Sequence, residues 1–240
     1  MRPTVIQLRQ FYSSRLGRRV KQRLRQLVVA RWGSADAQET VLGLGYAVPV
    51  LRVLERSKPA ALIALMPAEQ GAIYWPVHSE NHSVLGDALM PPFAVGSLHR
   101  VLMLHQFEYA ARPKELLDVY WQMLAPGGRL LLIVPNRRSY WASFGSTPFA
   151  RGTPFSISQM KELLAEARFT VADISGALYA PPSNHAFWLK TWPLVERLGR
   201  LCFPAVGGVL IIEAEKQIYA SIPEPVKGWV PAAAVKISAA

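Results

Sequence analysis

Short apolar runs recur along the chain and alternate with segments whose apolar residues have helical spacing. The runs lie at residues 40–44, 61–66, 83–85, 100–104, 129–134, 169–174 and 209–213. All are far shorter than the roughly 18 apolar residues of a membrane-spanning helix, so we interpret them as buried strands. Buried strands that alternate with helices are typical of a mainly parallel sheet with helices on both faces. The sequence therefore predicts an α/β fold.

The segments between the runs carry start and stop signals of helices. We expect helices at residues 48–54, 113–124, 156–168 and 187–201. The helix at 113–124 begins at Pro113, a residue favoured in the first turn, and two glycines follow soon after its end. The helix at 156–168 has Ser156 or Ser158 as its candidate N-cap.

Positive charge is concentrated at the amino-terminal end. The chain has a net charge of +11, and residues 1–33 hold nine arginines or lysines and no acid, which leaves about +2 for the remainder. An arm of this charge predicts contact with an acidic partner, an anionic membrane surface or nucleic acid. The alternative is a solvated helix face without a partner.

Apolar residues recur every four positions within this arm. They are Leu8, Tyr12, Leu16, Val20, Leu24 and Val28. The spacing predicts a basic amphipathic helix whose apolar stripe packs onto the rest of the protein, with Gly17 as its weak point.

The remaining chain is interpreted as one domain followed by a tail. Residues 34–221 hold all the predicted strands, whereas residues 222–240 are rich in proline and alanine, have no periodicity and are expected to be disordered. The single cysteine, Cys202, excludes an internal disulfide, and the first residues lack the apolar segment of a secretory signal. We therefore expect a cytoplasmic protein. No cysteine or histidine cluster has metal-ligand spacing, so no metal site is predicted.

A glycine-containing loop follows the first predicted strand. Gly43, Gly45 and Ala47 lie within five residues there and would let the backbone pass close to a ligand. The alternative is a tight turn that only packs a helix on the strand. In an open parallel sheet, ligands bind beyond the carboxyl ends of the strands, which is where this loop is expected.

Later segments give the loop a context. Gly86-Asp87-Ala88-Leu89 follows a short strand, residues 99–109 contain His105-Gln106-Phe107, and Leu124-Ala125-Pro126-Gly127-Gly128-Arg129-Leu130 precedes the 129–134 run. In this order and spacing, residues 40–134 resemble the type 11 branch of the class I S-adenosylmethionine-dependent methyltransferases. The resemblance implies a Rossmann-like sheet of seven strands, mostly parallel, with the basic helix added at the amino terminus.

The resemblance also implies a cofactor site for S-adenosylmethionine. The glycine loop would cradle the methionine part, the end of the second strand would face the ribose, and Asp87 would accept a hydrogen bond from the adenine amino group. His105 and Phe107 would line the methyl-transfer cavity. The implied cofactor-binding positions are Gly43, Gly45, Tyr46, Ala47, Met66, Pro67, Asp87, Ala88, Leu89, His105 and Phe107.

Two positions depart from the family pattern. The family usually has an acid where Gly43 stands and another where Met66 and Pro67 stand. Losing a charge-assisted hydrogen bond costs about 1.5–3 kcal/mol, which lowers affinity roughly tenfold to a hundredfold unless another group substitutes. Glu69 is the nearest candidate, with a solvated loop acid as the alternative interpretation.

His105 is the candidate catalytic base, because it is expected at a strand end that faces the crevice. The alternative for His105 is a structural histidine. The alternative for Asp87 is an acid that caps a turn or a helix. We therefore predict a methyltransferase that acts on a small or medium-sized acceptor. The competing hypothesis is an inactive methyltransferase-like scaffold or regulatory protein, favoured by the missing acids.

Overall fold

The computed structural model describes residues 2–77, 79–143 and 147–217. Its centre is a sheet of seven strands in the order β3-β2-β1-β4-β5-β7-β6. The strands are β1 (Thr40–Gly45), β2 (Ala61–Pro67), β3 (Ser83–Gly86), β4 (Leu98–Leu104), β5 (Leu124–Pro135), β6 (Phe169–Ala177) and β7 (Val209–Lys216). Each of the predicted apolar runs thus lies in a strand.

The sheet is mostly parallel. Strands β1 to β5 pair in parallel, whereas β7 is antiparallel to both β5 and β6. The predicted Rossmann-like sheet is confirmed.

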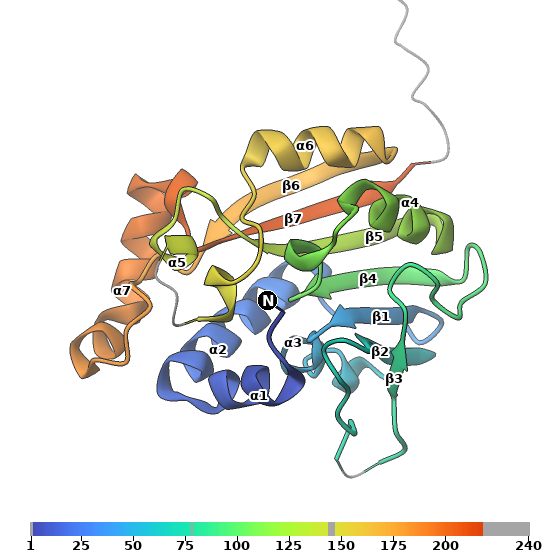
Figure 1. The fold of residues 1–240 in the computed structure, drawn as a ribbon, viewed down its shortest axis with the longest axis horizontal. Coiled ribbons are helices and arrows are strands. Elements are labelled where there is room, and N and C mark those ends of the chain that lie inside the picture. The colour runs from blue at the N-terminus through green and yellow to red at the C-terminus, as the bar shows by residue number, and fades with distance from the viewer. Residues whose placement is uncertain (1, 78, 144–146, 218–240) are drawn as a thin grey trace, which may run out of the picture.

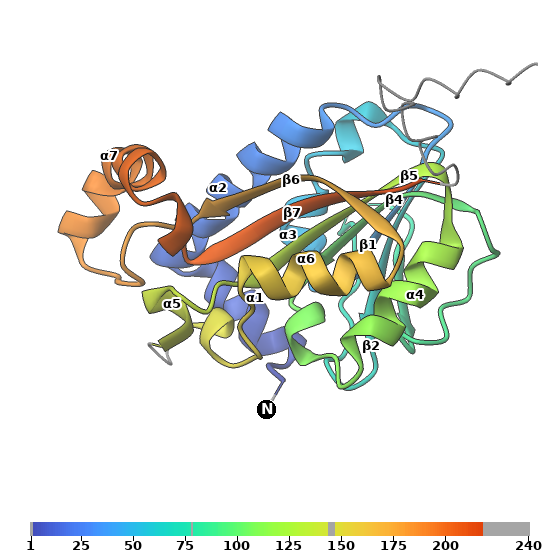
Figure 2. The same ribbon diagram turned by 90° about the horizontal axis from the view of Figure 1, so that it is seen from above.

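Helices cover both faces of the sheet. They are α1 (Val5–Ser13), α2 (Arg15–Trp32), α3 (Val48–Leu51), α4 (Pro113–Met123), α5 (Tyr140–Ser143), α6 (Ile157–Glu166) and α7 (Ala186–Cys202). Figure 2 shows α2 and α3 on one face and α4 and α6 on the other. One apolar core lies under each face, as expected for a sheet sandwiched between helices.

The basic arm forms two helices in place of the single one expected. The break lies at Ser14, three residues before the predicted weak point at Gly17. The Ser14 side chain accepts a hydrogen bond from the Gly17 amide at 2.9 Å and so caps the second helix. In Figure 1, α1 lies at the end of the sheet that carries the arrowheads of β1 and β4, so the break turns α1 over the carboxyl ends of these strands.

The predicted stripe of the arm packs on the domain. All six of its residues are buried, and they belong to the same apolar core as Val41 of β1 and Leu102 of β4. Some of the arm's charge is also used internally, because Arg31 forms ion pairs with Asp173 and Glu213. The arm is therefore a structural part of the fold as well as a basic surface.

No helix in the described ranges is both long and apolar enough to cross a bilayer. The tail predicted to be disordered, residues 222–240, lies outside the described residues.

Candidate functional site

The order of the strands places a crevice at the carboxyl ends of β1 and β4. The chain runs from β1 outward to β2 and β3, then crosses back to β4 on the other side of β1. Ligands of open α/β sheets bind at such a switch point. The predicted site residues lie at or just beyond the ends of β1, β2, β3 and β4, and therefore at this edge of the sheet.

One half of the crevice is an open cleft of about 340 Å³. Its lining combines three strand ends with the start of the chain and of α4: Arg2, Pro67, Ala68, Glu69, Gly86, Asp87, Ala88, Leu89, Gln106, Tyr109, Ala110, Ala111, Arg112 and Leu116. Four predicted cofactor positions, Pro67, Asp87, Ala88 and Leu89, are among them.

Asp87 lies exposed at this cleft, directly after β3. Its Oδ1 accepts a hydrogen bond from the Leu89 amide at 2.8 Å. Asp87 thus caps a turn, the role that the sequence offered as the alternative to adenine binding. The bond also fixes the orientation of the carboxylate at the cleft wall. The two interpretations of Asp87 are therefore compatible.

The end of β2 presents Pro67 and Glu69 to the cleft, whereas the Met66 side chain is fully buried in the core. Glu69 is largely exposed, and its Oε2 lies 3.5 Å from Nη1 of Arg2. An acid is therefore available close to the end of β2, although it lies two residues beyond the strand.

The glycine loop packs tightly against its surroundings. Gly45 has a φ of +78°, and a Cβ at this residue would lie 2.5 Å from the Leu104 carbonyl oxygen. A Cβ at Gly43 would collide with the Leu51 side chain and lie 2.7 Å from Cβ of Ala47. The acid that the family usually has at the position of Gly43 thus has no room here, because Ala47 and Leu51 fill the space.

The other half of the crevice is filled by side chains of the protein itself. Tyr12 of α1 stacks on Tyr46, with ring centroids 5.8 Å apart, and both are buried together with Ala47. The Tyr12 hydroxyl lies 2.8 Å from Nε2 of His105, and Nδ1 of His105 lies 3.2 Å from Oε1 of Glu108. These three side chains form one buried hydrogen-bonded chain, Tyr12–His105–Glu108.

Burial keeps the hydroxyl of Tyr12 protonated. Burial raises the pKa of Tyr12 well above its ordinary value of 10, with smaller contributions from Tyr46 and Glu108. A neutral phenol can donate its proton to Nε2 of His105, and Nδ1 then donates to Glu108. His105 also has a φ of +56°, an uncommon conformation for a residue with a side chain and one that concentrates at functional sites.

Three buried acceptor oxygens near the chain have no hydrogen-bond partner among the described residues. They are Oε1 of Gln70, Oε1 of Gln106 and Oε2 of Glu108. The side-chain amide nitrogen of Gln70 donates to the His105 carbonyl at 3.2 Å. This bond fixes the direction in which Oε1 of Gln70 points. A buried polar group without a partner costs about 1–3 kcal/mol, so such a cluster points to a ligand that brings hydrogen-bond donors.

Phe107 lies apart from this cluster. It packs in the core under α4 and α6, 5.2 Å from the ring of Phe155, and does not line the cleft. Phe149 stands beside His105 instead, with ring centroids 4.7 Å apart. Sequence reasoning did not single out Tyr12 or Glu108. Tyr12 looked like any member of the apolar stripe, and Glu108 was visible only as the acid three residues after His105.

Comparison with models of protein families and with curated sequences finds no match. Solved structures do match at the level of the fold. A SAM-dependent methyltransferase from Thermotoga maritima has a TM-score of 0.59 and 14% identity, covering 87% of this chain and 94% of its own. The geranyl diphosphate C-methyltransferase from Streptomyces coelicolor, in complex with S-adenosyl-L-homocysteine, has a TM-score of 0.56 and 17% identity, covering 80% and 76%.

The cyclase SpnF matches equally well, with a TM-score of 0.56 and 16% identity over 85% of this chain and 83% of its own. The same fold therefore carries more than one activity, and the site has to decide the function. The chain has the fold of the SAM-dependent methyltransferases.

Proposed function

We propose that this protein is an S-adenosylmethionine-dependent methyltransferase whose small or medium-sized acceptor presents a hydroxyl group. The observation that carries the proposal is the buried Tyr12–His105–Glu108 chain beside a cleft that holds Asp87. The type 11 branch and a cytoplasmic location remain part of the proposal.

The residues at the crevice match the hydrogen-bonding groups of the cofactor. S-adenosylmethionine supplies, when bound, a methyl group activated by positively charged sulfur, and its ammonium, amino and ribose hydroxyl groups are hydrogen-bond donors. The free oxygens of Gln70, Gln106 and Glu108 and the carboxylates of Asp87 and Glu69 are all acceptors. In this proposal Asp87 holds the adenine amino group and Glu69 serves the ribose in place of the missing acid.

His105 is the proposed general base. With Nδ1 donating to Glu108, the lone pair of Nε2 faces Tyr12 and can take a proton from a hydroxyl group. Glu108 orients the imidazole and stabilises the charge that His105 gains, in the manner of an acid–histidine pair in hydrolases.

The class of acceptor follows from the group now bonded to His105. Nε2 is paired with the hydroxyl of Tyr12 and lies among the buried aromatic rings of Tyr12, Tyr46 and Phe149. An acceptor that displaces the Tyr12 ring would place its own hydroxyl on Nε2. A phenol matches the displaced group in size and polarity, so we expect transfer to a phenolic oxygen.

The test is transfer of a tritiated methyl group to four aromatic acceptors that differ only in the reacting group: a phenol, a thiophenol, an aniline and a toluene. We expect label in the phenol, and loss of that label in His105→Ala. Transfer to the aniline alone, at the same rate in His105→Ala, would contradict the role of the base, because a neutral amine needs no deprotonation before attack.

A second candidate is an inactive methyltransferase-like scaffold. Its support is the packing of Tyr12 on Tyr46 above the glycine loop, where the methionine part of the cofactor would lie. This candidate predicts that neither S-adenosylmethionine nor S-adenosylhomocysteine binds to the protein. The two candidates are therefore separated by a binding measurement without any acceptor.

A further inference from the structure

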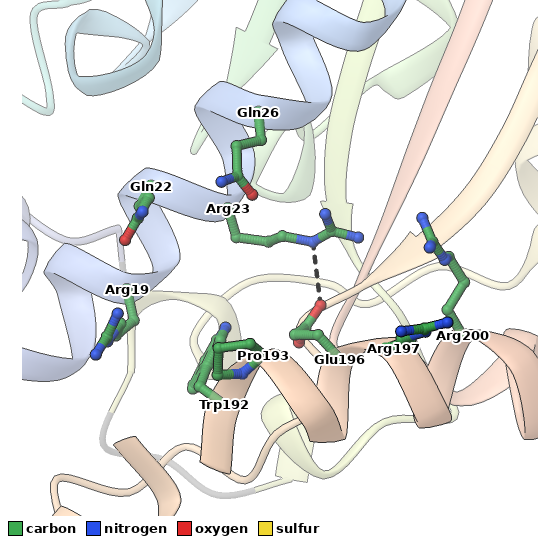
Figure 3. Close-up of a pocket in the computed structure, with 9 residues that line it drawn as sticks. All are labelled: Arg19, Gln22, Arg23, Gln26, Trp192, Pro193, Glu196, Arg197 and Arg200. Atoms are coloured by element: carbon green, nitrogen blue, oxygen red, sulfur yellow. Dashed lines mark hydrogen bonds and ion pairs between the residues drawn. The ribbon is translucent and has the colours of Figure 1, made fainter. Parts of the chain in front are cut away.

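A second cleft lies between α2 and α7, away from the crevice. It has a volume of about 250 Å³ and is lined by four arginines, Arg19 and Arg23 from α2 and Arg197 and Arg200 from α7. Figure 3 shows these side chains on two facing helices, with Glu196 and Trp192 on the α7 side. We call it the α2–α7 cleft.

Among the described residues that line this cleft, Glu196 is the single acid, and both of its oxygens are hydrogen-bonded. Glu196 accepts a hydrogen bond from Nε of Arg23 at 3.2 Å and is bonded to the backbone amides of Tyr179 and Ala180 at 2.5 and 3.4 Å. Arg19, Arg197 and Arg200 are exposed and form no ion pair with any described residue. The α2–α7 cleft is therefore an uncompensated cationic site, suited to a phosphate group.

Trp192 adds a further donor at the edge of the cleft. Its side chain is buried, and its indole Nε1 has no hydrogen-bond partner among the described residues. A buried donor without an acceptor is costly, so an acceptor supplied by a ligand would stabilise it.

The outer face of α7 carries a stripe of exposed apolar residues. Phe187, Leu194, Leu198 and Leu201 are 65%, 58%, 50% and 79% exposed, and Phe203 follows at 64%. We call these five residues the α7 stripe. Residues three or four apart are neighbours on a helix, so Arg197 of the cleft adjoins Leu194 and Leu201 of the stripe. The cationic cleft and the apolar stripe are thus one continuous surface.

We propose that this surface docks on an anionic phospholipid bilayer. The α2–α7 cleft receives a lipid phosphate, and the α7 stripe enters the boundary between headgroups and acyl chains. A basic surface bordered by exposed Phe and Leu on one helix is the pattern of helices that lie in the membrane interface. The inference is independent of the proposed methyl transfer.

Charge complementarity favours a bilayer over the other partners. A second copy would bring the same arginines together, and like charges at an interface are unfavourable. Nucleic acid would satisfy the arginines but would leave the α7 stripe in water. An anionic bilayer satisfies both parts of the surface.

The experiment is co-sedimentation of the full-length protein with vesicles of phosphatidylcholine, either alone or with about one third phosphatidylglycerol. We expect binding to the mixed vesicles and much weaker binding to the neutral ones. Arg197→Gln/Arg200→Gln should weaken binding about thirtyfold, because each cation near an anionic surface contributes about fivefold. Leu198→Ser/Leu201→Ser should weaken it about tenfold or more, because leucine burial drives insertion.

Two double variants are matched controls. Arg56→Gln/Lys161→Gln removes the same charge from exposed positions elsewhere, and Met90→Ser/Val95→Ser removes exposed apolar side chains outside α7. Both should bind the mixed vesicles within about threefold of the unchanged protein, because neither touches the proposed surface. All the substituted side chains are exposed, so the variants should keep the far-ultraviolet circular dichroism and melting temperature of the parent.

Several outcomes would overturn the proposal. The first is absence of binding to the mixed vesicles. A second is binding that Leu198→Ser/Leu201→Ser leaves unchanged, which would indicate simple charge attraction by the arm. A third is that the parent protein is a dimer in sedimentation velocity, whereas Leu198→Ser/Leu201→Ser is a monomer that still binds the vesicles. The leucines would then form a dimer interface. A fourth is binding of single-stranded RNA that competes with vesicles and resists the leucine changes.

Discussion

The two halves of the crevice differ in what fills them. The half at the ends of β2 and β3 is an open cleft with the carboxylates of Asp87 and Glu69 in its walls. The half above β1 and β4 is closed, because Tyr12 of α1 covers Tyr46 and bonds to His105. The open half is lined mainly by the ends of the strands and the start of α4, with Arg2 of the arm at its side. The closed half is covered by Tyr12 of the arm.

In the proposed function, this difference would separate recognition of the cofactor from the chemistry. The open half offers acceptors for the adenosine part of a cofactor, and the closed half holds the candidate base out of water. Tyr12 would leave the closed half only when a ligand takes over the contacts that Tyr12 now makes with Tyr46 and His105. The arm would then control access to the base, as lids do in enzymes that exclude water from the reacting groups.

The largest expected effect is that of His105→Ala. Loss of a general base typically lowers turnover about 10²- to 10⁴-fold. Affinity for S-adenosylhomocysteine should stay within about threefold, because the proposed base acts on the acceptor, even though the family resemblance also places His105 among the cofactor-lining positions. The measurements are methyl-transfer rates and calorimetric titration of the same preparation.

His185→Ala is the matched control for this variant, because His185 is exposed and outside both halves of the crevice. It should retain the parent rate. Equal losses of cofactor affinity and turnover in His105→Ala would contradict the separation of the two halves.

Asp87→Ala should have the next largest effect, on the open half. Removing a charge-assisted acceptor costs about 1.5–3 kcal/mol, so affinity for S-adenosylhomocysteine should fall roughly tenfold to a hundredfold. Asp36→Ala, at an exposed turn before β1, is the control and should bind as the parent does. Unchanged binding by Asp87→Ala in calorimetry would show that adenine is held elsewhere.

Tyr12→Phe tests the closed half through alkaline stability. Burial raises the pKa of Tyr12 in the folded protein, whereas the unfolded chain loses this proton near pH 10. Above pH 10 the folded state therefore binds more protons than the unfolded state, and the free energy of unfolding falls by about 1.4 kcal/mol per pH unit from this group. Tyr12→Phe removes that slope and should be less sensitive to alkali.

The measurement is urea unfolding of the parent and of Tyr12→Phe at intervals between about pH 9 and pH 11. Below pH 10 the variant should lose only about 0.5–1.5 kcal/mol for the missing hydrogen bond to His105. Parallel pH curves for the two proteins would mean that Tyr12 is not buried, and that the closed half is open in solution.

Glu69→Gln should have the smallest effect. Its side chain is 80% exposed and pairs with Arg2 across 3.5 Å, an arrangement that water and salt screen. We expect cofactor affinity to fall only about twofold to threefold and to depend on ionic strength. A loss as large as that of Asp87→Ala would make Glu69 the principal ribose ligand and would extend the open half toward β2.

The sequence predicted the sheet well because strand signals are local. Short apolar runs bounded by Pro or Gly, such as the one that ends at Pro67, needed no tertiary information. The break at Ser14 was missed, since a serine inside a periodic stripe resembles any exposed helical residue. Capping there decides the position of α1 and hence of Tyr12.

The site was less predictable, because its parts come from distant segments. Tyr12 and His105 are 93 residues apart, and only the position of α1 over the end of β4 brings them together. The departure at Gly43 could be noticed in the sequence, but its cause could not: Leu51 and Ala47 occupy the space that an acid would need. Local patterns locate strand ends, whereas contacts between distant segments build the chemistry.

Calorimetric titration of the unchanged protein with S-adenosylmethionine and S-adenosylhomocysteine tests the central proposal most directly. Micromolar affinity for both, about 8 kcal/mol of binding free energy, is the predicted result and would mean that Asp87 and the free acceptors replace the missing acids. Absence of binding up to about millimolar cofactor, near 4 kcal/mol, would contradict the methyltransferase proposal and favour the scaffold.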